Sequence, residues 1–507
     1  MILITIFVCF CLASAFNYFK TRKQRAFITN LKGPFTFPLW GSMQKVFILS
    51  SKNYFKKSQN YLTNFGTLSR CWVFDRLFIP TADYEFVTQL LQHADYTNTG
   101  YNLPKLWLNG SLLLSDGDSW QNRRKLISHF FQPNFLETAV EIFTAESNIL
   151  VERLRCKSKE NNSFDVHNFV SKAVLDIVIA STLGIKGDAQ TEEISEYAKT
   201  VEDLTEILMD RFFHAHSANN ITYATLRPFT RRRLKRMIKT INHINHEIIE
   251  EYRVQSLNNK LNNNNNFTIR ISNHKKILSM KHTTLLDILL GSTIASESLT
   301  NEEISSEINT FLYQGYLFTS SAISFTLVMI ARHPSVQYKL YEEIQKVWPK
   351  STDCFYSVNE LKQLKYLECV IKETLRLYPS EPIICRELNK NFEYTHSVVG
   401  DGIIPAGAEI YISIFHMLRD EMKFDNPTTF MPERYFDIDS NNTSNLTAFS
   451  MGPRNCPAQN FSMLLMKCLI AQLLTAYEIL PYGDEMRLEV KIVLKSSNGF
   501  QIGLKPR

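Results

Sequence analysis

Apolar residues recur at helical spacing along most of the chain. The pattern is clearest in EFVTQLLQHA (85–94), FVSKAVLDIVIASTLG (169–184), EEISSEINTFLYQG (302–315) and SAISFTLVMIARH (321–333). Two segments resemble strands instead, GTLSRCWVFDRLFIP (66–80) and AEIYISIF (408–415). No internal period repeats. The pattern predicts a mainly α-helical fold with a smaller share of strands.

The first apolar run predicts a membrane anchor at residues 1–19. No charged residue occurs before Lys20, and Lys20, Arg22, Lys23 and Arg25 follow together. About eighteen apolar residues suffice to span the ~30 Å hydrocarbon layer as a helix. ASA at 13–15 resembles a cleavage site, but a signal peptide carries its positive charge before the apolar run. Basic residues after the run favour an anchor that keeps the remaining chain cytosolic.

The rest of the chain divides into a linker and one domain. We expect residues 20–45, which are basic and contain prolines, to form the linker and residues 46–507 to form the domain. Within the domain, the asparagine-rich segment 258–276 predicts a flexible loop, because it contains too little apolar surface to order itself. The basic run 227–239 is typical of a solvated helix face, with contact to anionic lipid as the alternative.

Composition narrows the class of protein. The chain has 507 residues, of which 44% are hydrophobic and 21% are charged, so it can bury a large core. Its net charge of +6 is too weak to indicate nucleic-acid binding. The nine cysteines are scattered without a C-x-x-C pair. This usage favours a reducing compartment over a disulfide framework or a zinc ribbon.

One cysteine stands in an unusual loop, FSMGPRNCPAQNF (449–461), just before an apolar helical run. The amide groups and dipole of a helix N-terminus stabilise a thiolate, and Arg454 lies two residues before Cys456. Such a thiolate is a nucleophile or a metal ligand. The alternative is a reduced cysteine in a tight turn.

Three further patterns are weak when taken singly. Glu373 and Arg376 are three residues apart, so they share a helix face and can pair. Trp120 and Arg124 are four apart, and their N–H groups suit a carboxylate. FMPERY (430–435) places Arg434 shortly before the cysteine loop.

Together, in this order, these segments resemble the cytochrome P-450 family of haem-thiolate monooxygenases. The resemblance covers nearly the whole chain. Local sequences such as ARHPSVQ and YLECVIKETLRLYPS are most similar to family four, which includes fatty-acid ω-hydroxylases and many insect enzymes. The matched motifs are Phe-x-x-Gly-x-Arg-x-Cys (Phe449, Gly452, Arg454, Cys456), Glu-x-x-Arg (Glu373, Arg376), Phe-x-Pro-x-Arg (Phe430, Pro432, Arg434) and Trp-x-x-x-Arg (Trp120, Arg124).

The resemblance implies a single large cytochrome P-450 fold with a small β-rich subdomain, and it also implies a role for each matched residue. Cys456 is expected to be the axial ligand of the iron of haem b, with Phe449 shielding the thiolate. Glu373, Arg376 and Arg434 are expected to form a buried structural network. The haem should otherwise be held non-covalently, because Gln314 stands where many family-four members have a glutamate that esterifies it. The residues expected to bind the haem propionates are Trp120, Arg124, Arg386 and Arg454.

The same resemblance implies an activity. We expect insertion of one oxygen atom from O2 into a lipophilic substrate: a fatty acid, a hormone or a foreign compound such as an insecticide. NADPH electrons would come from a membrane-bound flavoprotein reductase, with cytochrome b5 as a further partner. The enzyme would lie in the endoplasmic reticulum membrane with its catalytic domain in the cytosol. Segment 101–114 is expected to help form the pocket roof.

Three positions depart from the family pattern. Ala458 replaces the glycine that is usual two residues after the cysteine. In the oxygen-side helix, Leu317 and Phe318 replace the usual acid and alcohol, which leaves Thr319 as the candidate catalytic residue. A one-residue shift pairing Thr319 with Ser320 is disfavoured, because both flanks align without a gap. The alternative functions are therefore a haem isomerase or dehydratase that acts on peroxides, and a weakly active or non-oxygenase haem protein.

Overall fold

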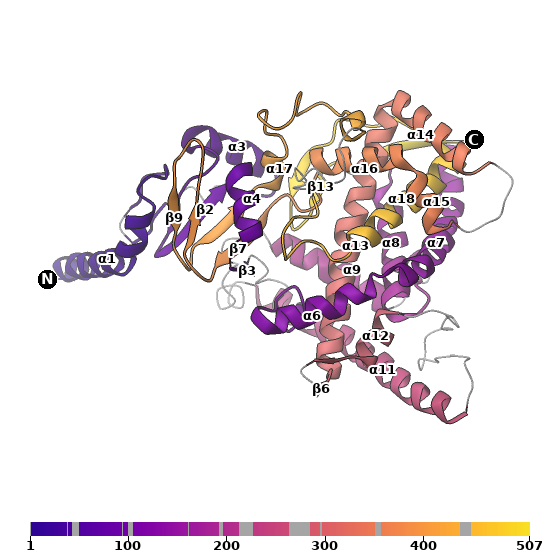
Figure 1. Cartoon of the computed structure of the whole chain (residues 1–507), viewed down its shortest axis with the longest axis horizontal. Helices are drawn as coiled ribbons and strands as arrows, with labels where there is room; N and C mark the ends of the chain where they lie inside the picture. Colours follow the sequence, from indigo (N-terminus) through magenta and orange to yellow (C-terminus); the bar gives the residue numbers. More distant parts are fainter. Residues whose placement is uncertain are drawn as a thin grey trace.

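The computed structural model describes residues 2–37, 39–42, 50–93, 95–99, 105–160, 162–191, 196–211, 227–262, 284–294, 297–349, 356–436 and 448–507. It is mainly helical (Figure 1). The helices are α1 (Ile2–Phe27), α3 (Tyr54–Phe65), α4 (Tyr84–His93), α5 (Lys105–Leu108), α6 (Gly117–Phe130), α7 (Pro133–Glu160), α8 (His167–Leu183), α9 (Glu196–Arg211), α11 (Pro228–Asn262), α12 (Leu285–Gly291), α13 (Asn301–Arg332), α14 (Pro334–Val347), α15 (Val358–Gln363), α16 (Lys365–Leu377), α17 (Ile414–Met417), the 3-10 helix η2 (Pro432–Tyr435) and α18 (Gln459–Ala476).

The strands form small sheets beside the helices. The largest has the order β1-β2-β10-β7-β3, in which β2 and β10 are parallel and the other neighbours antiparallel. This sheet confirms the expected β-rich part. The strands are β1 (Cys71–Val73), β2 (Arg76–Thr81), β3 (Tyr96–Thr99), β4 (Phe164–Asp165), β5 (Thr293–Ile294), β6 (Glu297–Ser298), β7 (Ile384–Leu388), β8 (Phe392–Tyr394), β9 (Gly402–Ile404), β10 (Glu409–Ile412), β11 (Tyr477–Leu480), β12 (Leu488–Val490), β13 (Leu494–Ser496) and β14 (Gln501–Pro506).

Helix α13 runs through the centre of the helical part. It is one continuous helix, so the segments 302–315 and 321–333 belong to the same element. A capping box starts it, in which the Thr300 hydroxyl accepts from the Glu303 amide and the Glu303 carboxylate accepts from the Thr300 amide. Within the described part of the chain, α13 alone is long and apolar enough to span a membrane. Because 83% of its most apolar stretch is buried in the protein, it is a core helix.

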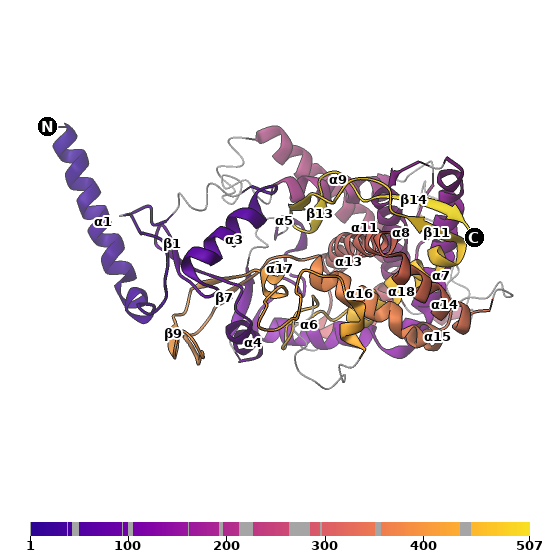
Figure 2. The ribbon, with the colours of Figure 1, turned by 90° about the horizontal axis from the view of Figure 1, so that it is seen from above.

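Helix α1 extends away from the remaining protein (Figure 2). It continues to Phe27, so the first part of the predicted 20–45 linker is helical rather than irregular. Large apolar side chains on α1, such as Leu12 and Phe16, are exposed. The anchor at 1–19 stays a prediction.

Helix α11 contains both most of the basic run 227–239 and the start of the asparagine-rich segment 258–276. This helix includes the basic run, whose charged side chains are mostly exposed while Leu234 is buried, as expected of a solvated face. Arg233 of this run pairs with Asp203 of α9 at 2.9 Å. The helix continues to Asn262, so the predicted loop 258–276 begins as helix, and its remainder lies outside the described residues.

Candidate active site

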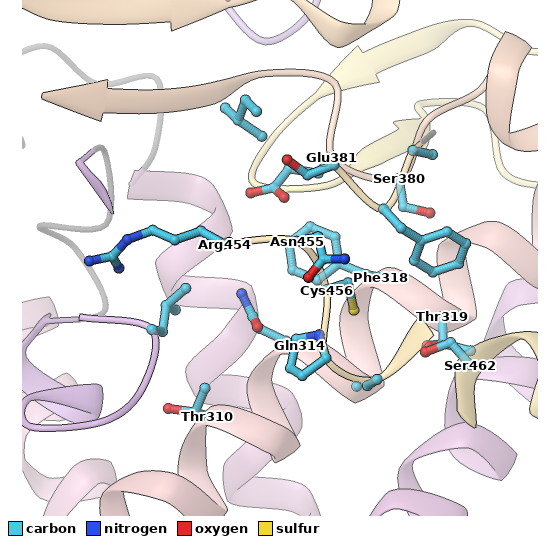
Figure 3. A pocket seen from close by; sticks show the side chains of 18 of the residues that line it. Thr310, Gln314, Phe318, Thr319, Ser380, Glu381, Arg454, Asn455, Cys456 and Ser462 are labelled. Carbon is cyan, nitrogen blue, oxygen red and sulfur yellow. The ribbon is translucent and has the colours of Figure 1, made fainter. Parts of the chain in front are cut away.

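A deep pocket lies between α13, α6, β7 and the cysteine loop 449–458. It contains about 1530 Å³ of space free of protein atoms, including space open to solvent. In Figure 3, Gln314, Phe318 and Thr319 on α13 face the loop that carries Arg454, Asn455 and Cys456. The structure brings every candidate site residue to this pocket: Trp120, Arg124, Thr319, Arg386, Phe449, Arg454 and Cys456.

The cysteine loop has a fixed backbone. The Cys456 amide donates to the Phe449 carbonyl at 3.0 Å and so closes the loop. Gly452 has φ +73°, in the left-handed region, and a Cβ there would lie 2.0 Å from the Leu91 carbonyl oxygen. Only glycine fits that position. Ala458, by contrast, has φ −95° as the N-cap of α18, so its backbone does not need glycine.

The electrostatics of Cys456 differ from the sequence-based expectation. Burial raises the pKa of its thiol to about 11, which outweighs a hydrogen bond from the Ala458 amide and the charge of Arg124. The helix start therefore does not by itself make a thiolate here. The helpful cation is Arg124 and not Arg454. Coordination to a metal ion deprotonates a thiol outright, so the thiolate expectation depends on a metal.

Two of the pocket's guanidinium groups are held by residues remote in sequence. Arg124 donates to the Asn455 carbonyl at 2.6 Å and to the Asn455 side chain. Arg454 donates to Asp116 at 2.9 Å and stacks 4.5 Å from the centre of the Trp120 ring. Both arginines thus have fixed positions at the pocket wall.

Arg386, on β7, carries the third guanidinium group of the pocket, and this group can still donate a hydrogen bond. It is buried, and its Nη1 donates to the Cys385 carbonyl at 2.9 Å. Its Nε–H is buried with no hydrogen-bond partner among the described residues, as is the Ser380 hydroxyl at the same pocket. An unpaired buried donor costs about 1–3 kcal/mol. An acidic ligand in this pocket would remove that cost for Arg386.

A buried ionic network lies behind the cysteine loop. Glu373 accepts from Arg376 Nε at 2.7 Å, from Arg434 Nε at 3.0 Å and from the Met431 amide at 2.9 Å. Arg376 also donates to the carbonyls of Leu418, at 3.0 Å, and Pro427, at 2.6 Å. The carboxylate of Glu373 is fully buried. This arrangement confirms the prediction of a buried structural network.

The α13 face of the pocket has a different chemistry. Phe318 and Thr319 both line the pocket, whereas Leu317 is buried in the core away from it. The Ser320 hydroxyl donates to the Tyr316 carbonyl of its own helix at 2.5 Å and is buried, so it cannot replace the missing alcohol. The Thr319 hydroxyl has no hydrogen-bond partner in the described part of the chain and remains available to the pocket.

Some pocket residues were not predicted. Asn455 could have been noticed as the neighbour of Cys456, but its partner Arg124 is 331 residues away. No local signal marks Glu381, which lies in a turn between α16 and β7 and lines the pocket. From the predicted roof segment 101–114, Leu112 and Leu113 line the pocket. Residues 101–104 of that segment lie outside the described residues.

Comparisons with known proteins agree with this site. The cytochrome P450 family model matches residues 31–503. Probable cytochrome P450 316a1 of Drosophila melanogaster is 43% identical, with full coverage of both chains. Cytochrome P450 4d8 of the same fly is 39% identical over 92% of this chain and 99% of that protein. Cytochrome P450 4d2 is 35% identical over 94% of each. The last two names carry the family-four number that the sequence resembles.

Proposed function

Because the chain belongs to the cytochrome P450 family of haem-thiolate monooxygenases, we propose that Cys456 ligates the iron of a haem b in this pocket and that the enzyme oxidises a lipophilic substrate. One observation carries the assignment. A single cavity is lined by the Cys456 side chain, by three guanidinium groups and by many apolar side chains. A haem needs all three: a thiolate for iron, cations for its propionates and apolar walls for its macrocycle.

The residues present fit this cofactor. The Arg386 Nε–H lacks a partner among the described residues, and a propionate oxygen is a strong acceptor for it. Trp120, Arg124 and Arg454 stand at the same pocket and can hold the propionates. When bound, the haem iron activates dioxygen for insertion into a C–H bond. Gln314 lines the pocket but offers no carboxylate for an ester, so we propose that the Cys456–iron bond is the only covalent link.

Residues of the chain itself would position the cysteine, hold a proton and exclude bulk water. The Phe449 carbonyl fixes the Cys456 backbone, and the Ala458 amide donates to the sulfur. The Thr319 hydroxyl can hold and pass a proton on the oxygen side. Apolar side chains such as Phe311 and Phe318 exclude bulk water from that side.

The electron donors and the cellular location of the enzyme are proposed by analogy with other members of the family. We propose that an NADPH-dependent flavoprotein reductase, with cytochrome b5 as a second partner, serves an enzyme anchored in the endoplasmic reticulum membrane. The support is the apolar run, the basic cluster after it and the exposed Leu12 and Phe16 of α1. The sequon at Asn109 is exposed, so a cytosolic domain should leave it without glycan. A glycosidase-sensitive mobility shift would contradict this orientation.

A second candidate function rests on Phe318. Its ring lines the pocket at the position of the missing alcohol, and Leu317 supplies no acid. A substrate that already contains an O–O bond, such as a lipid peroxide, does not need dioxygen to be protonated. Isomerisation or dehydration of a peroxide, or weak oxygenase activity, is therefore the alternative to full monooxygenase activity.

A reduced carbon-monoxide difference spectrum tests the proposed function. The unmodified protein should give the band typical of thiolate ligation, and Cys456→Ala should abolish it. Cys156→Ala is the matched control, because Cys156 is exposed on α7 and should leave the band unchanged. A thiolate-type band that persists in Cys456→Ala would refute the assignment.

A further inference from the structure

Glu307 of α13 holds the segment 105–116, which precedes α6 and contributes two residues to the pocket wall. The Glu307 side chain is 1% exposed. Both of its carboxylate oxygens accept from the Leu112 amide, at 3.0 Å and 3.1 Å. One of these oxygens also accepts from Nη1 of Arg123, on α6, at 2.9 Å. A single buried carboxylate thus joins α13, α6 and the segment between α5 and α6.

This segment depends on such contacts for its position. Its one helix, α5, has four residues, and the chain after α5 continues in turns. Besides the bonds to Glu307, the Ser306 hydroxyl of α13 donates to the Asn109 carbonyl at 2.9 Å, and the Asn98 side chain of β3 donates to the Leu113 carbonyl at 3.1 Å. Because the segment has little regular structure of its own, these side chains determine where it lies.

The hydrogen bonds of Glu307 lie next to the pocket. Leu112 and Leu113 both line it with half-buried side chains. Thr310 lies three residues after Glu307, on the same face of α13, and lines the pocket as well (Figure 3). The bonds from the Leu112 amide to Glu307 therefore fix two walls of the pocket relative to each other, the apolar segment and α13.

Arg123 strengthens this attachment. Its side chain is 7% exposed, and its Nη2 donates to Glu303 at 2.7 Å, so the guanidinium is held between two carboxylates of α13. A buried charge needs its partners, because an unpaired one keeps the full cost of desolvation. Any other position of the segment would take the Leu112 amide away from the buried Glu307 carboxylate. The contacts therefore favour one position of the segment.

We propose that Glu307 is a positioning residue that keeps Leu112 and Leu113 in place, so that the apolar pocket is already formed when a lipophilic substrate enters. This inference rests on the proposed function, because it concerns substrates of the same pocket with its haem. Glu307 is not among the residues that line the pocket, so it acts through the Leu112 backbone. A ligand that finds both leucines in place does not have to order them, and binding that requires such ordering is weaker.

Hydrogen exchange at single amides tests the contact itself. In the haem-loaded, full-length protein, the Leu112 amide should exchange at least about tenfold more slowly than the amide of Leu113. Leu113 has the same side chain, and its amide donates to no group in the described part of the chain. Glu307→Gln should remove most of this difference, because the NH2 group of glutamine would face the donors of Leu112 and Arg123. Mass spectrometry with single-residue fragmentation measures both amides.

Two ligands of different size test the consequence for binding. Imidazole and 1-octylimidazole both ligate haem iron through nitrogen, and titration of the Soret shift gives their dissociation constants. Imidazole needs little of the pocket wall, whereas the octyl chain needs apolar walls such as Leu112 and Leu113. We expect Glu307→Gln to weaken binding of 1-octylimidazole about tenfold and to leave that of imidazole unchanged. A merely structural role would lower stability without changing the ratio of the two constants.

Glu303→Gln is the matched control. Glu303 contacts the same guanidinium from the same helix but does not contact Leu112, and glutamine also suits the capping box that starts α13. This variant should keep both the slow exchange of the Leu112 amide and the ratio of the two dissociation constants. Should Glu307→Gln fold poorly, the comparison of the Leu112 and Leu113 amides in the unmodified protein decides alone.

The outcomes separate this inference from the proposed function. Equal exchange of the two amides in an unmodified protein that gives the thiolate-type carbon-monoxide band would overturn the role of Glu307 and leave the proposed function intact. A ratio of dissociation constants that is unchanged in Glu307→Gln, or changed equally in Glu303→Gln, would also overturn it. Absence of the band from the unmodified protein would overturn the proposed function and this inference with it.

Discussion

The two sides of the pocket differ in how strongly polar contacts fix them. On the cysteine side, a backbone hydrogen bond, a left-handed glycine and the buried carboxylate of Glu373 hold the loop and the segment behind it. On the α13 side, Phe318 faces the pocket and Leu317 is buried, with the Thr319 hydroxyl beside them. The side that would hold a haem keeps the family pattern except at Ala458, whereas the side that would handle oxygen and substrate has lost both the acid and the alcohol.

This difference teaches that holding a cofactor and using it are separate requirements on the sequence. The polar groups behind the cysteine loop are mutually dependent, because each buried charge needs its partners. The side chains of Leu317 and Phe318 on α13 contain no polar group, so they are constrained mainly by the space they fill. Substitutions there can redirect chemistry while leaving the fold and the cofactor site intact.

The largest effect should come from breaking the network behind the cysteine loop. Glu373→Ala would leave the buried guanidiniums of Arg376 and Arg434 without their carboxylate partner. Removal of one partner of a buried ion pair typically costs about 3–5 kcal/mol. We expect a fall of this size in the free energy of unfolding, together with loss of haem on purification. Chemical denaturation and the haem-to-protein absorbance ratio measure the two.

Glu160→Ala is the control for that change. Glu160 forms an exposed ion pair with Lys157 at 2.8 Å on α7, and such pairs contribute little. Its removal should leave both the unfolding free energy and the haem content nearly unchanged. Equal effects of the two substitutions would show that burial of the network does not matter.

The sequence predicted those parts of both sides that depend on short spacings. Trp120 and Arg124, or Glu373 and Arg376, share a helix face by periodicity alone, and the structure places them as expected. Long-range partners could not be predicted in this way. The contact of Arg454 with Asp116 spans 338 residues, and only the folded chain shows it.

The predicted surroundings of Cys456 are present only in part, because the Ala458 amide at the helix start does lower the pKa of its thiol, whereas the cation that lowers it is Arg124 and not Arg454. From the sequence, we expected both the helix start and Arg454 to lower the pKa of Cys456. Burial, which the sequence does not display, has the larger and opposite effect.

Glu381 escaped notice for a related reason, since a glutamate in a turn is usually a solvated side chain. Its place at the pocket depends on a contact distant in sequence, in which the carbonyl of the preceding Ser380 accepts from the Leu494 amide.

On the α13 side, Phe318→Thr should improve the use of electrons. The hydroxyl would stand beside Thr319 on the pocket face and could pass a proton where the phenyl ring cannot. We expect product formed per NADPH consumed to rise by about tenfold, below the roughly hundredfold or more of a complete general acid. Simultaneous measurement of product, NADPH and hydrogen peroxide with a reductase present checks this.

Two further variants serve as controls for the coupling measurement. Phe311→Thr also removes a ring from this pocket but places its hydroxyl on an earlier turn of α13, away from Thr319, so it should admit water and should not raise coupling. Leu317→Asp would place a carboxylate in the core and not in the pocket, so it should lower stability without improving coupling. Tight coupling in the unmodified protein would show that the missing acid and alcohol are not needed.

The helical scaffold behind α13 should make stability depend on pH. Burial raises the pKa of Asp176 on α8 to about 7 and that of Glu146 on α7 to about 6. Asp176 accepts from the Ala189 amide at 2.7 Å, and Gln190 donates to Glu146 at 2.9 Å. The folded state holds protons on these two groups that the unfolded chain has already released, so their contribution to stability is largest near pH 4 and falls towards pH 7.

Each of these groups contributes at most about 1.4 kcal/mol per pH unit within its window. We expect the denaturation midpoint to fall between pH 4.5 and pH 6.5. Asp176→Asn should flatten this fall, because an amide does not titrate, although it loses part of the backbone contact. An unchanged slope in Asp176→Asn would show that the dependence arises elsewhere.

The smallest effect should be found at Ala458, on the cysteine side. The family favours glycine there, yet the backbone of Ala458 has φ −95°, which any residue adopts, and its amide still reaches the Cys456 sulfur. Ala458→Gly should therefore leave the carbon-monoxide band in place and lower stability by only about 0.5–1 kcal/mol, the usual entropic cost of glycine.

Gly452→Ala in the same loop is the opposite case, because its Cβ would lie 2.0 Å from the Leu91 carbonyl oxygen. Measured together by denaturation and difference spectra, Gly452→Ala should lose the band and Ala458→Gly should keep it. If Ala458→Gly instead raised the haem content markedly, the alanine methyl group would be shown to crowd the cofactor.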